Sequence, residues 1–409
     1  MTAESINFKS DFKRSLPDGW QWVRLGEVCK INPVRRSMLQ RSDETTTTFV
    51  PMAALDEIKG EIIRQETRPY VEVKKGYTYF EEKDVLFAKI TPCMQNGKHA
   101  IAKGLIGGIG FGSTEFHVIR PGNIIISEWI HSFIRQPWVL TSATAHFTGA
   151  VGQQRVPEYF LGNLLIPLPP LSEQKRIAAI LNEQMEAVQR ARKATQAQLE
   201  AAKALSAAYL RQVFPRPDEE LPEGWRWVRL GEVADFINGR AFKPDEWSNT
   251  GLPIIRIQNL TSIGAPFNYS AGVVDQCHLV QDGDLLISWS ATLDVFLWLR
   301  GPAVLNQHIF KVTEQAQLVR RDYLYFAVRE DMEEIRAQVH GATMRHITKP
   351  EFESIKIPLP PLSEQKRIAA ILNEQMEAVG KVRTALEAQL EHINTLPASL
   401  LRRAFEGGL

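Results

Sequence analysis

IPLPPLSEQKRIAAILNEQMEAV occupies residues 166–188, and the same 23 letters return unchanged at residues 357–379. At the same offset of 191 the alignment continues to Phe214 and Phe405, with 34 of 49 positions identical. A second repeat, LPDGWQWVRLGEV from Leu16, returns as LPEGWRWVRLGEV from Leu221. The chain is therefore written twice, as an opening motif, a variable stretch and a long repeated segment.

These repeats divide the chain into four predicted parts. Variable domain 1 takes residues 1–165 and variable domain 2 takes residues 215–356, and each is followed by a repeated helical region, at 166–214 and 357–409. Solenoid units are only about 20–45 residues long, so a solenoid is excluded. Divergent domains on near-identical connectors indicate one scaffold that presents two different surfaces.

Both repeated regions predict a long helix. The prolines of PLPPLSEQ keep the chain extended and the serine then begins a helix, which places the helix starts near Leu171 and Leu362. Apolar residues follow at alternating spacings of four and three, the pattern of a coiled-coil seam. Neither stripe is wide enough to be buried alone, so the helices are expected to pair antiparallel with each other. The predicted seam residues are Leu181, Met185, Val188, Leu199 and Tyr209 in the first helix and Leu372, Met376, Val379, Leu386 and Leu390 in the second.

Three other residues qualify this helical pair. Arg192 and Arg383 occupy equivalent seam positions, where they either set the register or, as we favour, extend to solvent. Pro397 is expected to break or kink the second helix and to leave residues 398–405 as a short final turn.

The variable domains show a different pattern. Short β-branched and aromatic runs alternate with Gly, Pro and Asn, which predicts α+β domains with strand-rich cores. The duplication predicts a pseudo-twofold molecule whose N-terminus lies near its C-terminus. The runs interpreted as strands are residues 84–90, 116–119, 253–257, 284–288 and 308–312.

Composition limits the function less than the repeats do. The chain has 44% hydrophobic and 23% charged residues and a net charge of +1, as expected of an ordinary globular protein. Residues 1–165 carry a net +3 and residues 215–356 a net −5, so charge alone does not indicate DNA binding. Cys29, Cys93 and Cys277 form no CxxC pair, which argues against disulfides or zinc and favours the cytoplasm. No apolar stretch is long enough to span a membrane.

Several motifs together resemble one known family. They are the two opening motifs, PLPPLSEQKRIAAIL before both helices, AKITPCMQNGK at 88–98, NQHIFKV at 306–312, GATMRHIT at 341–348 and the LLRRAFEGGL tail. In this combination they resemble the specificity subunits of Type I restriction-modification systems, and the resemblance covers nearly the whole chain.

The resemblance implies two target-recognition domains at the two ends of an antiparallel helix pair, each reading one half of a split site in double-stranded DNA. It implies docking of two modification (methyltransferase) subunits, which two restriction subunits can join. S-adenosylmethionine, ATP and magnesium would belong to those partners, and this chain would hold no cofactor or metal. The acidic balance of residues 215–356 departs from expectation and indicates that any positive charge there is local.

The first 44-residue helical segment, 171–214, would span about 66 Å at about 1.5 Å per residue and so act as a ruler between the two readers. Readers on one face of the duplex lie roughly one turn apart, which leaves an unread gap of about 5–8 base pairs in an asymmetric site.

Candidate DNA-contacting residues lie on loops next to predicted strands. Amides suit adenine edges, and lysine or arginine suits guanine or phosphate. The alternative for each is a solvated loop or, for the residues just before the helices, a clamp between domain and helix. In variable domain 1 the candidates are Lys89, Thr91, Gln95, Asn96, Lys98, Gln153, Gln154 and Arg155. In variable domain 2 they are Arg240, Lys243, Trp289, Ser290, Thr292, Gln307, His308, Arg345 and His346.

Two of these, Gln307 and His308, flank an apolar strand, so a structural role is favoured for them. Trp20, Trp22, Trp225 and Trp227 are interpreted as core anchors rather than stacking platforms for bases.

No sequence motif indicates catalysis. The chain has no Asn-Pro-Pro-aromatic loop, no GxxxxGK[ST] and no HExxH, so we expect a non-catalytic subunit. A nuclease acting through scattered acids, a lone DNA-binding regulator and a protein adaptor are the alternatives.

Overall fold

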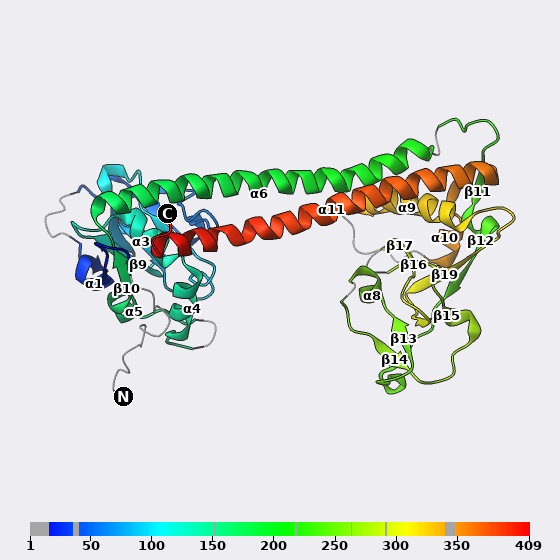
Figure 1. The fold of residues 1–409 in the computed structure, drawn as a ribbon, viewed down its shortest axis with the longest axis horizontal. Coiled ribbons are helices and arrows are strands. Elements are labelled where there is room, and N and C mark those ends of the chain that lie inside the picture. Colours follow the sequence, from blue (N-terminus) through cyan, green and yellow to red (C-terminus); the bar gives the residue numbers. More distant parts are fainter. Residues whose placement is uncertain are drawn as a thin grey trace. The chain divides into compact units, whose positions relative to one another are not determined.

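The computed structural model describes residues 16–35, 41–150, 153–216, 219–262, 264–290, 293–339 and 348–409. It divides into two compact units. Unit 1 contains Met1–Ala194 and Leu390–Leu409, and unit 2 contains Thr195–Gln389. Two long helices, α6 (Leu171–Val213) and α11 (Leu362–Phe405), each run through both units (Figure 1).

The starts of the two long helices confirm the sequence prediction to the residue. Pro170 accepts the backbone N–H groups of Glu173 and Gln174 at 2.9 and 3.0 Å, and Pro361 accepts those of the equivalent residues of α11. Each helix begins at a leucine, so the serine lies one residue inside the helix and is not the residue before it.

The helices pack antiparallel. In unit 1 the start of α6, through Ile177 and Leu181, shares a core with Leu401 and Phe405 at the end of α11. In unit 2 the end of α6 shares a core with Ile368 and Leu372 at the start of α11. All ten residues of the predicted seam are shielded, as a pairing of the two helices requires, and their contacts across the seam stay a prediction. Leu181, Val188, Leu199, Leu372 and Val379 are buried, and Met185, Tyr209, Met376, Leu386 and Leu390 are half-buried.

The two seam arginines and the proline were predicted less well. Arg383 extends to solvent as expected, with its guanidinium 3.8 Å from Glu387. Arg192 is half-buried and lines a groove of about 830 Å³ in unit 1. Of the break or kink predicted at Pro397, the break and the short final turn are wrong, because α11 continues through Pro397 to Phe405. A proline inside a helix costs about 3 kcal/mol, and burial of Leu401, Ala404 and Phe405 offsets that cost.

Each variable domain is closed by its two flanking repeats. The opening motif forms β1 (Gln21–Arg24), which pairs antiparallel with β10 (Leu165–Leu168) just before α6. In the second copy β11 (Arg226–Arg229) pairs with β20 (Lys356–Leu359) in the same register. The chain therefore enters and leaves each variable domain at one place on the helical scaffold.

Two four-stranded sheets build each variable domain, and the two domains have the same topology. The first sheet has the order β2-β9-β6-β7 in domain 1 and β12-β19-β16-β17 in domain 2, and all of its pairings are antiparallel. The second sheet has the order β4-β3-β8-β5 or β14-β13-β18-β15, and its central pair is parallel in both. All five predicted strand runs are confirmed, as β6, β9, β13, β16 and β19.

The strands of the first sheets are β2 (Cys29–Ile31), β9 (Phe116–Pro121), β6 (Val85–Ala88), β7 (His99–Ile101), β12 (Ala234–Asn238), β19 (Ile309–Glu314), β16 (Leu285–Ser288) and β17 (Asp294–Leu297). Those of the second sheets are β4 (Glu66–Pro69), β3 (Thr46–Val50), β8 (Ile109–Gly112), β5 (Thr78–Glu81), β14 (Asn268–Ser270), β13 (Leu252–Ile255), β18 (Ala303–Leu305) and β15 (Leu279–Val280). The shorter helices are α1 (Leu25–Val28), α2 (Tyr70–Val73), α3 (Ser127–Ile134), α4 (Pro137–Ala145), α5 (Glu158–Asn163), α7 (Leu230–Val233), α8 (Ile257–Thr261), α9 (Arg321–Val339) and α10 (Lys349–Glu353).

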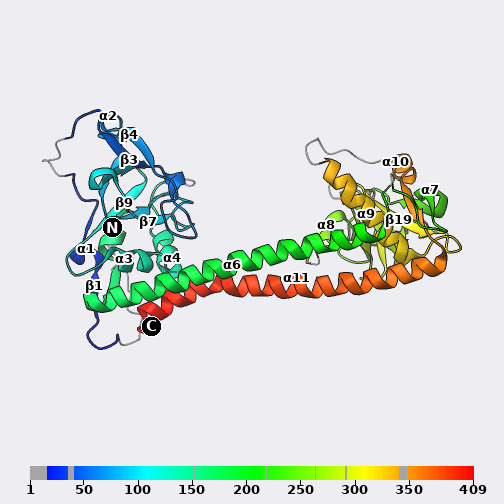
Figure 2. The same ribbon diagram turned by 90° about the horizontal axis from the view of Figure 1, so that it is seen from above.

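Both faces of the first sheet are buried. Along β6, Val85 and Phe87 join the core shared with α3 and the long helices, whereas Leu86 joins a separate core against the second sheet. In domain 2, Leu285 and Ile287 face the helices in the same way, and Leu286 faces the second sheet. Figure 2 shows β3 and β4 of unit 1 on the side away from α6.

The four tryptophans of the opening motifs are all half-buried. Trp20 and Trp225 pack against the main cores, which fits the interpretation as anchors. None of the described helices is long and apolar enough to cross a membrane.

One buried and one half-buried histidine, His99 and His131, should make unit 1 sensitive to acid. His99 is completely buried with its ring stacked on Phe87 at 4.2 Å, and burial lowers its pKa well below the usual value. Burial, followed by the charge of Arg135, lowers the pKa of His131 to about 3. The unfolded chain therefore binds protons below about pH 6.5 that the folded chain does not, so stability is lost as the pH falls below that value.

We predict that His99→Phe, which keeps the stacking but cannot titrate, reduces the loss of unfolding free energy between pH 6 and 5 by about 1.4 kcal/mol per pH unit. Urea unfolding followed by tryptophan fluorescence at both pH values measures this. His392→Gln on the exposed surface of α11 serves as the control and should keep the wild-type slope. An unchanged slope in His99→Phe would contradict the prediction.

Candidate nucleic-acid interface

The candidate residues of the two domains gather at the same edge of equivalent sheets. Because β2 and β6 both run antiparallel to β9, the ends of β2 and β6 and the start of β9 share one edge. The ends of β12 and β16 and the start of β19 share the matching edge in domain 2. We call these two places the loop edges. Lys89 directly follows β6, Trp289 follows β16, and His308 directly precedes β19.

In domain 1 the loop edge joins two segments that are far apart in the sequence. The backbone N–H of Thr91 donates to Gln154 at 3.0 Å, and that of Val156 donates to Lys89 at 2.9 Å. The loop after β6 is thereby held beside the segment that precedes α5. Gln95 and Gln153 are exposed here, whereas Lys89, Thr91 and Gln154 are half-buried.

Three domain 1 candidates already have partners within the protein. Arg155 donates to both carboxylate oxygens of Glu115 at 2.8 Å, which lowers the pKa of that carboxyl. Lys98 donates to the carbonyl of Leu55 at 3.2 Å, and Asn96 donates to Glu57 at 3.3 Å. These contacts give Arg155, Lys98 and Asn96 partners within the protein, and the exposed amides of Gln95 and Gln153 remain the better candidates for contact with DNA.

In domain 2 the loop edge is aromatic and polar. The Trp289 indole N–H donates to Asn238 at 3.3 Å, and the ring lies 5.2 Å from the His308 ring. The side chains of Gln307 and His308 are 3.1 Å apart. Arg240 stacks on Phe242 at 4.2 Å and bonds to Glu246.

The other domain 2 candidates differ in exposure, and three of them are not described. Lys243 is exposed and Ser290 is half-buried. Thr292, Arg345 and His346 lie outside the described residues. Among the described candidates of domain 2, Arg240 is paired with Glu246 and Lys243 is exposed, and the amides of Asn238 and Gln307 lie beside Trp289 and His308. The expected local concentration of positive charge stays a prediction.

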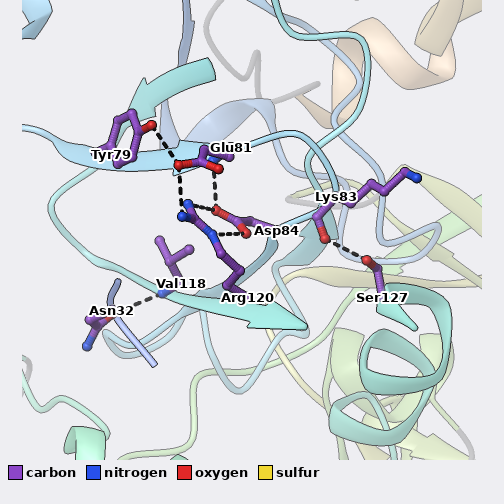
Figure 3. Close-up of polar contacts among 8 residues, drawn as sticks. All are labelled: Asn32, Tyr79, Glu81, Lys83, Asp84, Val118, Arg120 and Ser127. Carbon is purple, nitrogen blue, oxygen red and sulfur yellow. Dashed lines mark hydrogen bonds and ion pairs between the residues drawn. The ribbon is translucent and has the colours of Figure 1, made fainter. Parts of the chain in front are cut away.

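The buried Asp84 and the half-buried Glu81 of domain 1 are structural, because both pair with Arg120. Figure 3 shows Arg120 of β9 with both Asp84 and Glu81. Arg120 donates to the two oxygens of Asp84 at 2.8 and 2.7 Å and to Glu81 at 2.8 Å. Burial raises the pKa of Asp84, and the bonds from Arg120 oppose that rise. Within the described residues no group of three or more His, Cys, Asp or Glu could hold a metal ion.

Sequence reasoning missed three residues. Asn238 lies in the turn with Arg240, yet only the fold shows that it meets Trp289. Gln174 and Gln365 belong to the repeated SEQ triplet and are completely buried. The sequence feature that could have identified these two glutamines is their identity in the exact repeat, but that repeat was interpreted only as a helix start.

The two variable domains share one topology and are attached in the same way to the long helices, but they differ at equivalent loop edges. This arrangement defines a recognition protein with two different binding domains. The family model for the Type I restriction modification DNA specificity domain matches residues 17–201 and again 222–392. The chain belongs to this family and carries two copies of its domain.

Individual relatives agree. The Type I restriction enzyme EcoAI specificity subunit of Escherichia coli is 27% identical, over 93% of this chain and 82% of that protein. The EcoEI specificity subunit is 38% identical, over 60% of this chain and 41% of that protein.

Two solved structures are similar over 97% of this chain at 28% identity. One comes from work on complex assembly and conformational transition of the type I R-M system, with all of that chain covered and a TM-score of 0.82. The other is the HsdS subunit of Thermoanaerobacter tengcongensis, with 99% covered and a TM-score of 0.65.

The Arg120 cluster gives a test of the structural interpretation of these acids. Arg120→Met leaves the Asp84 side chain, which is 1% exposed, without its cation. We predict a loss of about 3–5 kcal/mol of unfolding free energy at pH 7, because an unpaired buried charge is costly. The loss should shrink at lower pH, where Asp84 becomes protonated.

Lys311→Met is the matched control in domain 2. Lys311 lies 3.2 Å from Asp284, but Arg321 also approaches that acid at 4.0 Å, so a smaller loss is expected. Denaturant unfolding of both variants decides, and equal losses would refute the argument.

Proposed function

We propose that this chain selects the DNA sequence for a Type I restriction-modification enzyme by reading a bipartite, asymmetric site. Each variable domain would read one half-site at its loop edge, and about 5–8 base pairs between the halves would stay unread. The observation that carries the proposal is the identical topology of two domains whose loop edges differ in chemistry. Gln95 and Gln153 are exposed at one edge, and Trp289 and His308 meet at the other.

The repeated helices support docking of two identical partners, which we propose are methyltransferase subunits. Leu171 and Leu362 are 38% and 41% exposed, and the ion pairs Glu173–Arg176 and Glu364–Arg367 recur on the surface of both helices at 2.7 and 2.6 Å. Packing within this chain does not demand identity at exposed positions. One surface displayed twice suits two copies of one partner.

Chemistry would reside in those partners. We propose that S-adenosylmethionine, ATP and magnesium bind to the methyltransferase and restriction subunits, and that this chain contributes sequence choice alone. A lone regulator would have no use for a paired docking surface, and an adaptor would show no sequence-dependent DNA affinity when its partner is present.

We predict that the isolated chain binds DNA weakly and that specific binding requires the methyltransferase subunits. The near-neutral charge of +1 provides little phosphate attraction to the chain alone. Electrophoretic titration at physiological salt, with and without the partner, should show a gain of about a thousandfold or more for the specific site over unrelated DNA. Tight specific binding by the chain alone would contradict the prediction.

We also predict that the two readers are independent. Replacing residues 27–160 with those of another specificity subunit should change one half-site and preserve the other, because each domain has its own core and its own strand pair on the scaffold. Mapping methylated positions in a host that carries the chimera tests this. A change in both half-sites would rule out independent reading.

A further inference from the structure

A buried glutamine connects the start of α6 to variable domain 1. The Gln174 amide oxygen accepts the backbone N–H of Ile126 at 3.0 Å. Its nitrogen donates to the carbonyls of Ile124 at 2.9 Å and Pro169 at 2.8 Å. The side chain is 0% exposed, so the three bonds form without competition from water.

The same connection occurs in unit 2 with different neighbours. The Gln365 oxygen accepts the N–H of Arg320 at 2.8 Å, and its nitrogen donates to the carbonyls of Leu318 at 3.0 Å and Pro360 at 2.8 Å. In both units the glutamine contacts the carbonyl of one domain residue and the N–H of the residue two positions later. The residue between them is buried in the core, as Ile125 or Val319.

A second pair of contacts follows at matching positions. Five residues after the contacted carbonyl, Trp129 donates its indole N–H to Pro167 at 2.9 Å, and Tyr323 donates its hydroxyl to Pro358 at 2.6 Å. These prolines are equivalent in the two repeats. Each ring also packs against a phenylalanine at the C-terminal end of a long helix. Trp129 packs against Phe405, the last residue of α11, and Tyr323 packs against Phe214, which directly follows α6. The ring centroids of Trp129 and Phe405 are 4.3 Å apart, and those of Tyr323 and Phe214 are 5.6 Å apart.

The repeated residues therefore form a socket, defined as Pro167, Gln174 and Phe405 in unit 1 and as Pro358, Gln365 and Phe214 in unit 2. From the variable domain it requires a backbone carbonyl, a backbone N–H two residues later and an aromatic donor five residues after the carbonyl. Most of these contacts are to the backbone, so the domains can diverge in sequence and still fit. Hydrogen bonds are directional, and two of the three on each buried amide reach the variable domain, so they restrict its orientation on the helix, whereas the third, to Pro169 or Pro360, holds the amide itself in place.

We propose that Gln174 and Gln365 are positioning residues that set the orientation in which each variable domain meets DNA, and through it the gap length that the protein accepts. This inference rests on the proposed reading of a split site. The loop-edge residues lie outside the socket, so the choice of bases within each half-site should not depend on these glutamines.

The test uses the chain assembled with its methyltransferase subunits and a series of duplexes whose gap is the cognate length or one base pair longer or shorter. Gln174→Met and Gln365→Met keep the length of the side chain and remove all its hydrogen bonds. Each should lower the ratio of Kd at the wrong gap to Kd at the cognate gap by about fivefold or more, roughly the effect of one buried hydrogen bond left unmade. Preference for the bases of each half-site should stay unchanged.

Gln196→Met is the matched control, because Gln196 is exposed on α6, and it should keep the wild-type ratio. Tyr323→Phe removes only the hydroxyl that donates to Pro358 and keeps the ring packed on Phe214. It therefore tests the positioning role in unit 2 if a glutamine variant does not assemble. Its ratio should fall in the same direction.

Assembled variants with the wild-type ratio would overturn the positioning role, as would variants that lose base preference instead of gap preference. If the wild-type assembly itself shows no dependence on sequence or gap, the proposed function fails, and this outcome is distinct from failure of the socket.

Discussion

Each variable domain is attached to the helical scaffold through buried polar contacts at one place. The strand pair β1–β10 or β11–β20 brings both ends of the domain together there, and the Gln174 or Gln365 amide saturates backbone groups that would otherwise be buried without partners. A buried group left without its hydrogen bond costs about 1–3 kcal/mol, so this junction tolerates little change. The rest of each domain builds outward from it.

The divergence of the two domains follows from this attachment. The first sheet is covered on both faces, so its strands need only β-branched or aromatic residues that alternate between two cores. Many sequences meet that condition, and domains of one topology can therefore share almost no sequence. The loop edges lie beyond the buried strands, and packing does not require the same side chains at the two edges. Their side chains can therefore differ.

Charge is distributed for stability as much as for binding. Arg155 is committed to Glu115, Arg120 to Asp84 and Arg240 to Glu246. Arg155 and Arg240 belong to the candidate interface, whereas Arg120 lies at the opposite edge of its sheet, and Lys243 is exposed. The two paired arginines are consistent with our proposal that partner subunits supply much of the attraction to the phosphate backbone. Base reading would then fall to amides and aromatic rings.

The sequence alone determined the duplication, both helix starts and the five strand runs, because each depends on local spacing or on letters that repeat. The break predicted at Pro397 was wrong because the buried Leu401 and Phe405 hold the helix together beyond the proline. Only the tertiary structure showed that the two variable domains share one topology, since strand order depends on which distant runs pair. The tertiary structure also decided which candidate residues already have partners within the protein. Arg155 pairs with Glu115, 40 residues away along the chain, and Lys98 pairs with Glu57, 41 residues away, and no local sequence pattern connects either pair.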